Sequence, residues 1–167
     1  MPNHVRNELR ISGDNRIIKQ LESFVQSATE TPNAEQLAFD FNNIIPQPNC
    51  VIKGCISLEE QAAYPNRNWY DWNIAHWDTK WNAYDCVRGS HGNYSFTTAW
   101  SAPLKVIAAL SWLYPELVFT LYCEEEAGSF HGEVQFKQGR QFGDLSSDDI
   151  SDANPSPKFL QTTVVAS

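Results

Sequence analysis

The chain has 167 residues, of which 42% are apolar and 13% aromatic, and it carries a formal net charge of −8 at pH 7. The length suits one domain with a substantial core, and the apolar content excludes a wholly disordered chain. The charge argues against a surface that binds nucleic-acid phosphates, because such surfaces gather lysine and arginine, whereas an acidic surface suits solubility or a basic partner.

The first predicted elements are a strand and a helix. Apolar residues alternate over 5–11, which predicts a strand with one buried side. Gly13 ends this strand, and Asp14 can cap a helix whose apolar stripe covers 17–25. The segment AFDFNNIIP, at 38–46, is predicted to be a second strand that ends at prolines.

A long insertion is expected at about 47–90. Its first part is irregular, apart from the piece SLEEQAAY, which favours a short helix. The next part, NWYDWNIAHWDTKWNAYD at 68–85, holds four of the chain's six tryptophans. The spacing of its aromatic residues predicts a helix that presents many of them on one side and that fails near Asp78.

The second half of the chain predicts a strand, a helix and two further strands. In YSFTTAW, the residues Tyr94, Phe96, Thr98 and Trp100 are expected to point inward. The segment APLKVIAALSWLYP is predicted to form a helix, with Pro103 near its first turn and Pro115 beyond its end. The strands LVFTLYCEEE and FHGEVQFKQG follow, joined by a short hairpin loop, Ala-Gly-Ser.

This order of elements predicts an α+β fold, a ferredoxin-like sandwich with an antiparallel sheet, helices on one face and a Trp-rich helical insertion. The domain is expected to cover 1–142. The segment 143–167 is polar, acidic and contains prolines, and is expected to be a flexible C-terminal tail.

Four segments resemble one family: MPNHVRNELRISGD, HWDTKWNAYD, SFTTAWSAP and LSWLYPELVFTLYCEEEAGSFHGE. In this order, over most of 1–138, they are similar to the YubB-type ferredoxin-like domains of phages, prophages and conjugative plasmids. The most specific stretch is WDTKWNA, in which Asp78 stands where the common pattern has glycine. Aspartate tolerates a left-handed turn, so this change leaves the fold intact. The resemblance implies a mobile-element origin, no iron–sulfur cluster and no catalytic residue to carry over.

The tryptophan segment is the first candidate site. Packing against a sheet is the favoured interpretation, since two of its indoles are spaced by one helical turn. The alternative is a ligand pocket that stacks a nucleobase, holds a cation or, with a histidine as general base, supports catalysis. The candidate residues of this pocket are Trp72, His76, Trp77, Lys80 and Trp81.

The acidic run at the end of a predicted strand is the second candidate site. A solvated turn is the simpler interpretation, and the alternative is a contact for a basic partner. The candidate residues are Glu124, Glu125, Glu126, Phe130 and His131. The histidine and cysteine spacings match no common metal site, so no metal, cofactor or catalytic residue is assigned, and the four cysteines are expected to be reduced thiols.

The expected function is non-catalytic protein binding. Because mobile elements often encode small inhibitors of host defence, we expect an inhibitor of a defence complex such as CRISPR, with a basic host protein or nucleoprotein complex as partner. The alternatives are a small-ligand binder or enzyme using the Trp-lined pocket and, third, an RNA-binding module, which the charge disfavours. The sequence has no apolar run of about 20 residues and no signal-like start, so a cytoplasmic location in a bacterial host is expected.

Overall fold

The computed structural model describes residues 3–27, 37–55, 57–65 and 67–147. Within these residues, seven strands form one sheet in which all pairings are antiparallel, and the spatial order is β2-β3-β1-β4-β5-β6, with β7 pairing β5. The strands are β1 (His4–Ser12), β2 (Tyr84–Arg88), β3 (Tyr94–Ala99), β4 (Val118–Glu125), β5 (Phe130–Lys137), β6 (Arg140–Phe142) and β7 (Ser146–Ser147).

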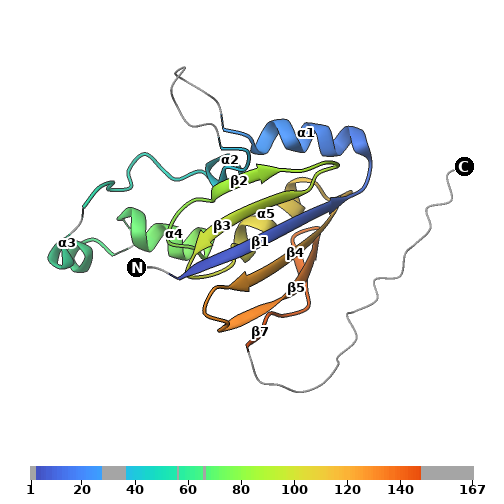
Figure 1. Cartoon of the computed structure of the whole chain (residues 1–167). Helices are drawn as coiled ribbons and strands as arrows, with labels where there is room; N and C mark the ends of the chain where they lie inside the picture. Colours follow the sequence, from blue (N-terminus) through green and yellow to red (C-terminus); the bar gives the residue numbers. More distant parts are fainter. Residues whose placement is uncertain (1–2, 28–36, 56, 66, 148–167) are drawn as a thin grey trace, which may run out of the picture.

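Five helices in the described ranges accompany the sheet, and α5 lies against its rear face in the view of Figure 1. Most outward side chains of the central strands are half-buried or exposed. An antiparallel sheet with helices packed on one face confirms the predicted α+β sandwich. No helix in the described part of the chain is long and apolar enough to cross a membrane. The helices are α1 (Asn15–Val25), α2 (Phe41–Ile44), α3 (Leu58–Ala63), α4 (Trp69–Trp77) and α5 (Leu104–Leu113).

The central strand β1 has the alternation that the sequence predicts. Val5, Asn7, Leu9 and Ile11 are buried, while the residues between them are half-buried or exposed. The strand pairs with β3 on one side and β4 on the other, so its inward side chains lie in the middle of the core. The predicted hairpin between β4 and β5 is also confirmed.

The prediction of a strand over 38–46 is wrong. Asp40 instead caps the short helix α2 by accepting the backbone N–H of Asn42, and the side chain of Asn82 accepts the N–H of Phe41. Side-chain oxygens therefore satisfy backbone groups that a sheet would otherwise pair. Both aromatic rings of this segment still reach the core, and Phe39 stacks on Phe96 at 5.1 Å.

The inward placement predicted for Trp100 is also wrong. Strand β3 ends at the fully buried Ala99, and Trp100 adopts a left-handed conformation, with a φ of 75°. This turn directs its indole outward, and the side chain is 39% exposed. Tyr94, Phe96 and Thr98 are buried as predicted.

The predicted insertion and tail contain elements that the sequence did not indicate. Strand β2 lies within the range 47–90 and forms one edge of the sheet, with a register shift between Tyr84 and Val87. Leu145 packs against the core, and β7 follows it. The remainder of the predicted tail, 148–167, lies outside the described residues.

The buried aromatic cluster under β3 leads to a stability prediction. Replacing the fully buried Phe39 with alanine removes its contacts with three aromatic rings, and we expect a loss of about 3–5 kcal/mol in the free energy of unfolding. Phe24→Ala is the matched control, because Phe24 is 37% exposed on α1. Urea denaturation of both variants checks the prediction, and equal losses would contradict it.

Candidate functional site

Helix α4 carries three of the tryptophans and ends in a left-handed turn. Its N-cap is Asn68, whose side-chain oxygen accepts the N–H of Asp71, and Asp78 ends it with a φ of 66°. The interruption predicted near this aspartate is confirmed. Because the chain reverses here, the residues that follow lie back against the helix, and the carbonyl of Lys80 accepts a hydrogen bond from the side chain of Asn73. The backbone N–H of Lys80 donates to the carbonyl of Ala99 at the end of β3.

Asp78 also joins α4 to the start of α5. Helix α5 has no side-chain cap of its own at Pro103, and the carboxylate of Asp78 accepts the N–H of Lys105 at 2.9 Å in its place. The ammonium of Lys105 pairs with the same carboxylate at 2.8 Å and donates to the carbonyl of Ala75. A negative charge at a helix N-terminus is stabilising, so one residue fixes two helix ends.

Two of the predicted pocket residues, the buried Trp72 and the exposed His76, pack against each other on α4. Trp72 is buried and meets Trp77 edge to face at 5.3 Å. The ring of His76 stacks on the indole of Trp72 at 4.3 Å, and its Nδ1–H donates to the backbone carbonyl of Trp72. Trp72 and His76 therefore lie outside the pocket described below.

Five aromatic side chains form a continuous surface, which we call the aromatic ridge. Their rings contact one another in two runs, Trp69 to Tyr70 to Trp100 and Trp81 to Tyr84, with centroid distances of 5.6–6.3 Å. The ammonium of Lys80 joins the runs, because it lies 4.8 Å from the ring centroid of Trp81 and 4.9 Å from that of Trp100. A cation between two indoles gains favourable electrostatic energy, which holds both rings in place.

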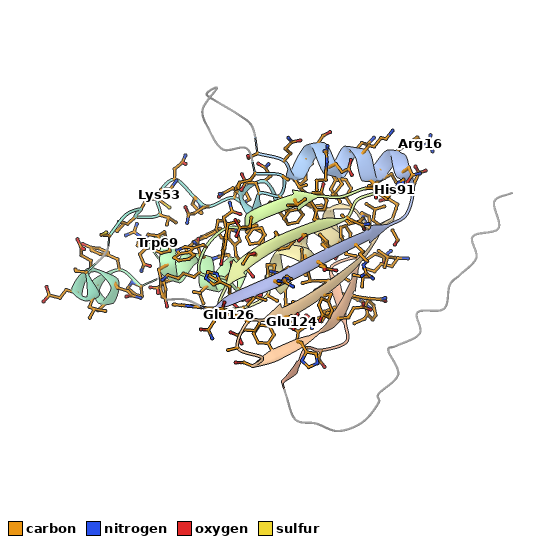
Figure 2. All side chains as sticks on the ribbon, viewed as in Figure 1. Arg16, Lys53, Trp69, His91, Glu124 and Glu126 are labelled. Atoms are coloured by element: carbon orange, nitrogen blue, oxygen red, sulfur yellow. The ribbon has the colours of Figure 1, made fainter. Side chains whose placement is uncertain are left out.

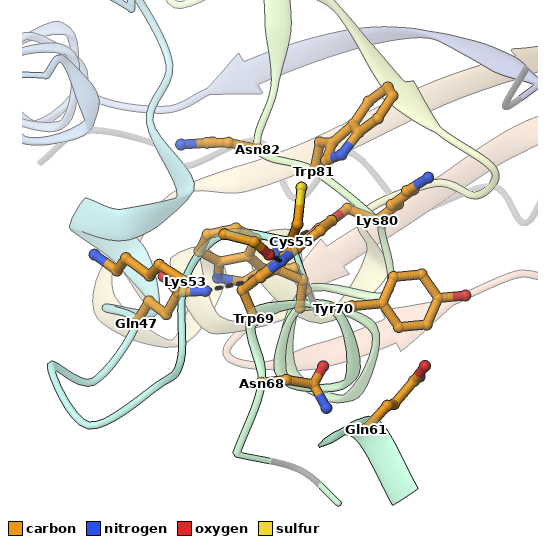
Figure 3. Close-up of a pocket in the computed structure, with 13 residues that line it drawn as sticks. Gln47, Lys53, Cys55, Gln61, Asn68, Trp69, Tyr70, Lys80, Trp81 and Asn82 are labelled. Carbon is orange, nitrogen blue, oxygen red and sulfur yellow. Dashed lines mark hydrogen bonds between the residues drawn. The ribbon is translucent and has the colours of Figure 1, made fainter. Parts of the chain in front are cut away.

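A pocket of about 900 Å³ opens beside the ridge (Figure 3). The structure brings three of the predicted residues to its lining, namely Trp77, Lys80 and Trp81. The remaining wall includes residues that were not singled out from the sequence, and amide side chains are frequent in it. These additional residues are Gln47, Lys53, Gly54, Cys55, Gln61, Asn68, Trp69, Tyr70, Asn73 and Asn82.

Backbone contacts hold the two walls of this pocket together. Ile52 accepts the N–H of Trp69 and donates its own N–H to Arg67, which ties the loop before α3 to the start of α4. The indole N–H of Trp69 also donates to the carbonyl of Gly54 at 2.8 Å. Trp69 was identifiable as part of an aromatic segment, whereas the irregular sequence around Lys53 gave no indication of its place.

The three glutamates of the acidic run do not share one surface. Glu125 is buried, and its carboxylate accepts the N–H groups of Ala127 and Ser129 within the hairpin loop. The hydrogen bond from the backbone N–H of Ser129 has the larger effect and that from Ala127 the smaller, and both hold the pKa of the Glu125 carboxyl below its usual range. Glu124 and Glu126 are exposed, and we call this pair the acidic corner.

The acidic corner borders a shallow hollow of about 370 Å³ that also includes His4, Arg6 and Thr97. His131 lies opposite Glu124 in the sheet register and is exposed on the same face. Phe130, its neighbour in sequence, is half-buried against the core on the other face. The structure thus separates Glu125 and Phe130 from the exposed candidates Glu124, Glu126 and His131.

His4 and Tyr84 connect the acidic corner with the aromatic ridge. The N–H of His4 donates to the carboxylate of Glu126 at 2.9 Å. The His4 ring meets Tyr84 edge to face at 5.8 Å, and its Nδ1 is hydrogen-bonded to the Tyr84 hydroxyl. In Figure 2, Trp69 and Glu126 lie toward the same end of the sheet. We call the two features together the ridge-and-corner surface.

The described residues offer no cluster of three histidine, cysteine or acidic side chains that could hold a metal ion. None of the four cysteines, which all lie in the described part of the chain, forms a disulfide. Burial raises the pKa of the Cys123 thiol to about 12, so this group stays protonated at neutral pH and is a poor nucleophile. The aromatic, charged and amide side chains of the site can contribute stacking, charge pairing and hydrogen bonding.

Comparison with known proteins identifies a family for the second half of the chain. Residues 76–164, more than half of the sequence, match the family model described as "Ferredoxin-like domain in Api92-like protein". The matched segment starts at the end of α4 and includes all strands after β1. No curated protein and no solved structure gave a significant match.

The role of Asp78 predicts a loss of stability on substitution. Asp78→Gly keeps the left-handed turn but removes both contacts with Lys105, and we expect the free energy of unfolding to fall by about 1–2 kcal/mol. Asp85→Gly is the control, because Asp85 also has a positive φ, of 51°, and is exposed. Urea denaturation should separate the two variants, and an unaffected Asp78→Gly protein would refute the capping role.

The buried Glu125 predicts a dependence of stability on pH. The pKa of Glu125 is lower in the folded state than in the unfolded chain, where it is about 4.3. The ionised carboxylate therefore contributes fully to folding stability above the unfolded-state pKa, and this contribution is lost as the pH falls through the folded-state pKa. We expect Glu125→Gln to be less stable than the wild type at pH 7 and the difference to shrink toward low pH. Glu124→Gln, an exposed change in the same strand, is the control, and denaturation midpoints across pH provide the measurement.

Proposed function

The chain belongs to the family of ferredoxin-like domains in Api92-like proteins, and from this premise we propose that it is a non-catalytic protein-binding module. The similarity of its segments to YubB-type domains supports an origin in a phage, prophage or conjugative plasmid. In that setting the module inhibits a host defence complex such as CRISPR. The partner is a basic protein or nucleoprotein complex in the cytoplasm of the bacterial host.

The observation that carries this proposal is the cation between two exposed indoles, beside exposed carboxylates. Trp81 and Trp100 are 38% and 39% exposed, and the ammonium of Lys80 shows that their faces suit a positive charge. Glu124 and Glu126 extend the same surface with negative charge. Lysine and arginine side chains of a basic partner would meet both kinds of group.

The composition of the ridge-and-corner surface also suits protein binding. Tryptophan, tyrosine and arginine are the residues most enriched among those that dominate binding energy at protein interfaces. The ridge supplies three tryptophans and two tyrosines in contact with one another, so few of their conformations remain to be lost on binding. The net charge of −8 would accelerate association with a basic partner.

The competing functions gain less from the geometry. An RNA-binding sheet stacks bases on exposed strand aromatics, but Tyr94 and Phe96 are buried against the helices. The catalytic alternative relied on His76 as the general base of the pocket, and His76 lies against Trp72 outside the pocket. Binding of a small ligand at the pocket remains compatible with protein binding at the ridge.

A pair of matched variants tests the ridge-and-corner surface. Trp81→Ala removes an exposed ridge indole, and Glu124→Lys reverses one charge of the acidic corner. Trp112→Ala and Glu116→Lys are the controls, since Trp112 is 70% exposed on α5 and Glu116 is exposed beyond the end of that helix. We expect each test variant to weaken partner binding by at least about tenfold, and the controls to bind like the wild type.

The readouts are capture from a bacterial lysate, with the partner identified by mass spectrometry, and a plasmid-interference assay in cells with an active CRISPR system. The wild-type protein is expected to capture a basic, nucleic-acid-handling complex and to restore transformation by the targeted plasmid. Both effects should be lost in Trp81→Ala and Glu124→Lys. Equal binding by test and control variants would exclude this surface, and a wild type without effect on any defence system would exclude the inhibitor function.

A further inference from the structure

The pocket beside the aromatic ridge has its own chemistry, which does not depend on the proposed protein-binding function. We infer that it binds a nucleotide, with the base against its aromatic wall and the phosphate at Lys53. The relevant observations are the charge of the lining, its aromatic surface, its amide groups and its volume. Each is a property of residues that come from three separate segments of the chain.

The lining is cationic although the protein is acidic. Among the residues that the structure describes, Lys53 and Lys80 line the pocket and no aspartate or glutamate does, in a chain whose formal charge is −8. Asp71 is close in sequence to these walls, but its carboxylate accepts hydrogen bonds from the side chains of Gln61 and Asn68. The local charge therefore favours an anionic ligand.

The two lysines have different surroundings. The ammonium of Lys80 lies between two indole rings of the ridge, at 4.8 and 4.9 Å from their centroids. Lys53 is exposed, and no ion pair within the described ranges involves it. In Figure 3 the two side chains lie on opposite sides of Trp69. Lys53 is thus the group available to pair with a phosphate.

The aromatic wall is suited to a flat ligand. Trp69 is half-buried at the start of α4, and its indole N–H is fixed on the carbonyl of Gly54. A ring held in this way loses little freedom when a base stacks on it. Stacking of a base on an aromatic side chain contributes about 1–3 kcal/mol and accepts any base.

Amide side chains provide hydrogen-bonding groups at the same wall. Gln47 donates from Nε2 to the side-chain oxygen of the buried Asn73, which in turn donates to the carbonyl of Lys80. This chain of hydrogen bonds fixes the orientation of the Gln47 amide and places its oxygen as an acceptor at the pocket wall. Nucleobases carry amino and imino donors that such an acceptor recognises.

The volume of the pocket lies within the range of small-molecule sites and leaves room for a nucleotide. Small-molecule sites span about 300–1,000 Å³, and this one has about 900 Å³. A long nucleic acid would also meet the acidic corner and the overall negative charge, which oppose its backbone. The ligand can be a free nucleotide or one nucleotide of a single strand, since both present the same base and phosphate.

Isothermal titration calorimetry of the full chain with AMP, GMP, CMP and UMP tests the inference. We expect at least one of the four to bind with a dissociation constant below about 1 mM. The corresponding nucleoside should bind at least about tenfold more weakly, because it lacks the phosphate that Lys53 holds. Lys53→Glu should cause a similar loss, and Lys19→Glu, an exposed change on α1, is the matched control.

A second pair of variants tests the stacking wall. Trp69→Leu and Trp69→Phe both lose the indole N–H bond to Gly54, but only phenylalanine keeps an aromatic face. We expect Trp69→Phe to retain most of the binding and Trp69→Leu to lose it, with thermal melting to show that both are folded. Equal binding by the two variants, or equal affinity for nucleotide and nucleoside, would overturn the inference.

The source of the nucleotide is distinguished by comparing UMP with a tetrauridylate oligonucleotide. Tighter binding of the oligonucleotide, beyond the statistical factor of about four for four equivalent residues, would identify single-stranded nucleic acid, and equal or weaker binding would identify a free nucleotide. Absence of binding by all four mononucleotides and by the oligonucleotide would overturn the proposal. This outcome would leave the ridge variants and their partner unaffected, so the two proposals can fail separately.

Discussion

The contact between Asp78 and the start of α5 determines where the site residues lie. The left-handed turn at Asp78 ends α4, and its carboxylate caps α5 through Lys105. The hydroxyl of Ser101 donates to the Asp78 carbonyl, which fixes the same turn from the end of β3. These contacts connect two helices and the end of a strand at the Asp78 turn, and they fix the direction in which the backbone leaves α4.

The backbone of residues 79–81, which follow Asp78, places Lys80 and Trp81 in the aromatic ridge. Thr79 is buried and its hydroxyl donates to the carbonyl of Trp81, while Asn73 on α4 donates to the carbonyl of Lys80. With its backbone held from both sides, Lys80 reaches between the two exposed indoles. One of these belongs to a positive-φ residue, Trp100, at the end of β3. A pair of left-handed turns, one after a helix and one after a strand, thus builds a surface that neither element forms alone.

The sequence was a good guide wherever periodicity or a turn decided the local structure. The alternation of β1, the stripe of α1, the β4–β5 hairpin and the interruption at Asp78 are all confirmed, as is the ferredoxin-like fold. The prediction for 38–46 failed because Asp40 and Asn82 satisfy its backbone through side chains, which alternation does not reveal. The placement of Lys53 depends on a bridge between separate segments, so periodicity gave no information about it. Glu125 keeps the alternation of β4, and the loop N–H groups that its carboxylate accepts explain why an acid occupies this buried position.

The position of the family match divides the pocket into two parts with different freedom to change. Trp77, Lys80, Trp81 and Asn82 fall within the matched range 76–164, and the segment they belong to is tied to the sheet. Gln47, Lys53 and Trp69 lie before that range, on a loop and a helix start that are joined by the bridge between Ile52 and Asn68. Insertions or substitutions in this outer wall leave the strands and their register untouched. Relatives that share the matched half can therefore diverge in what they recognise while keeping the same scaffold, as antibody loops do on a constant framework.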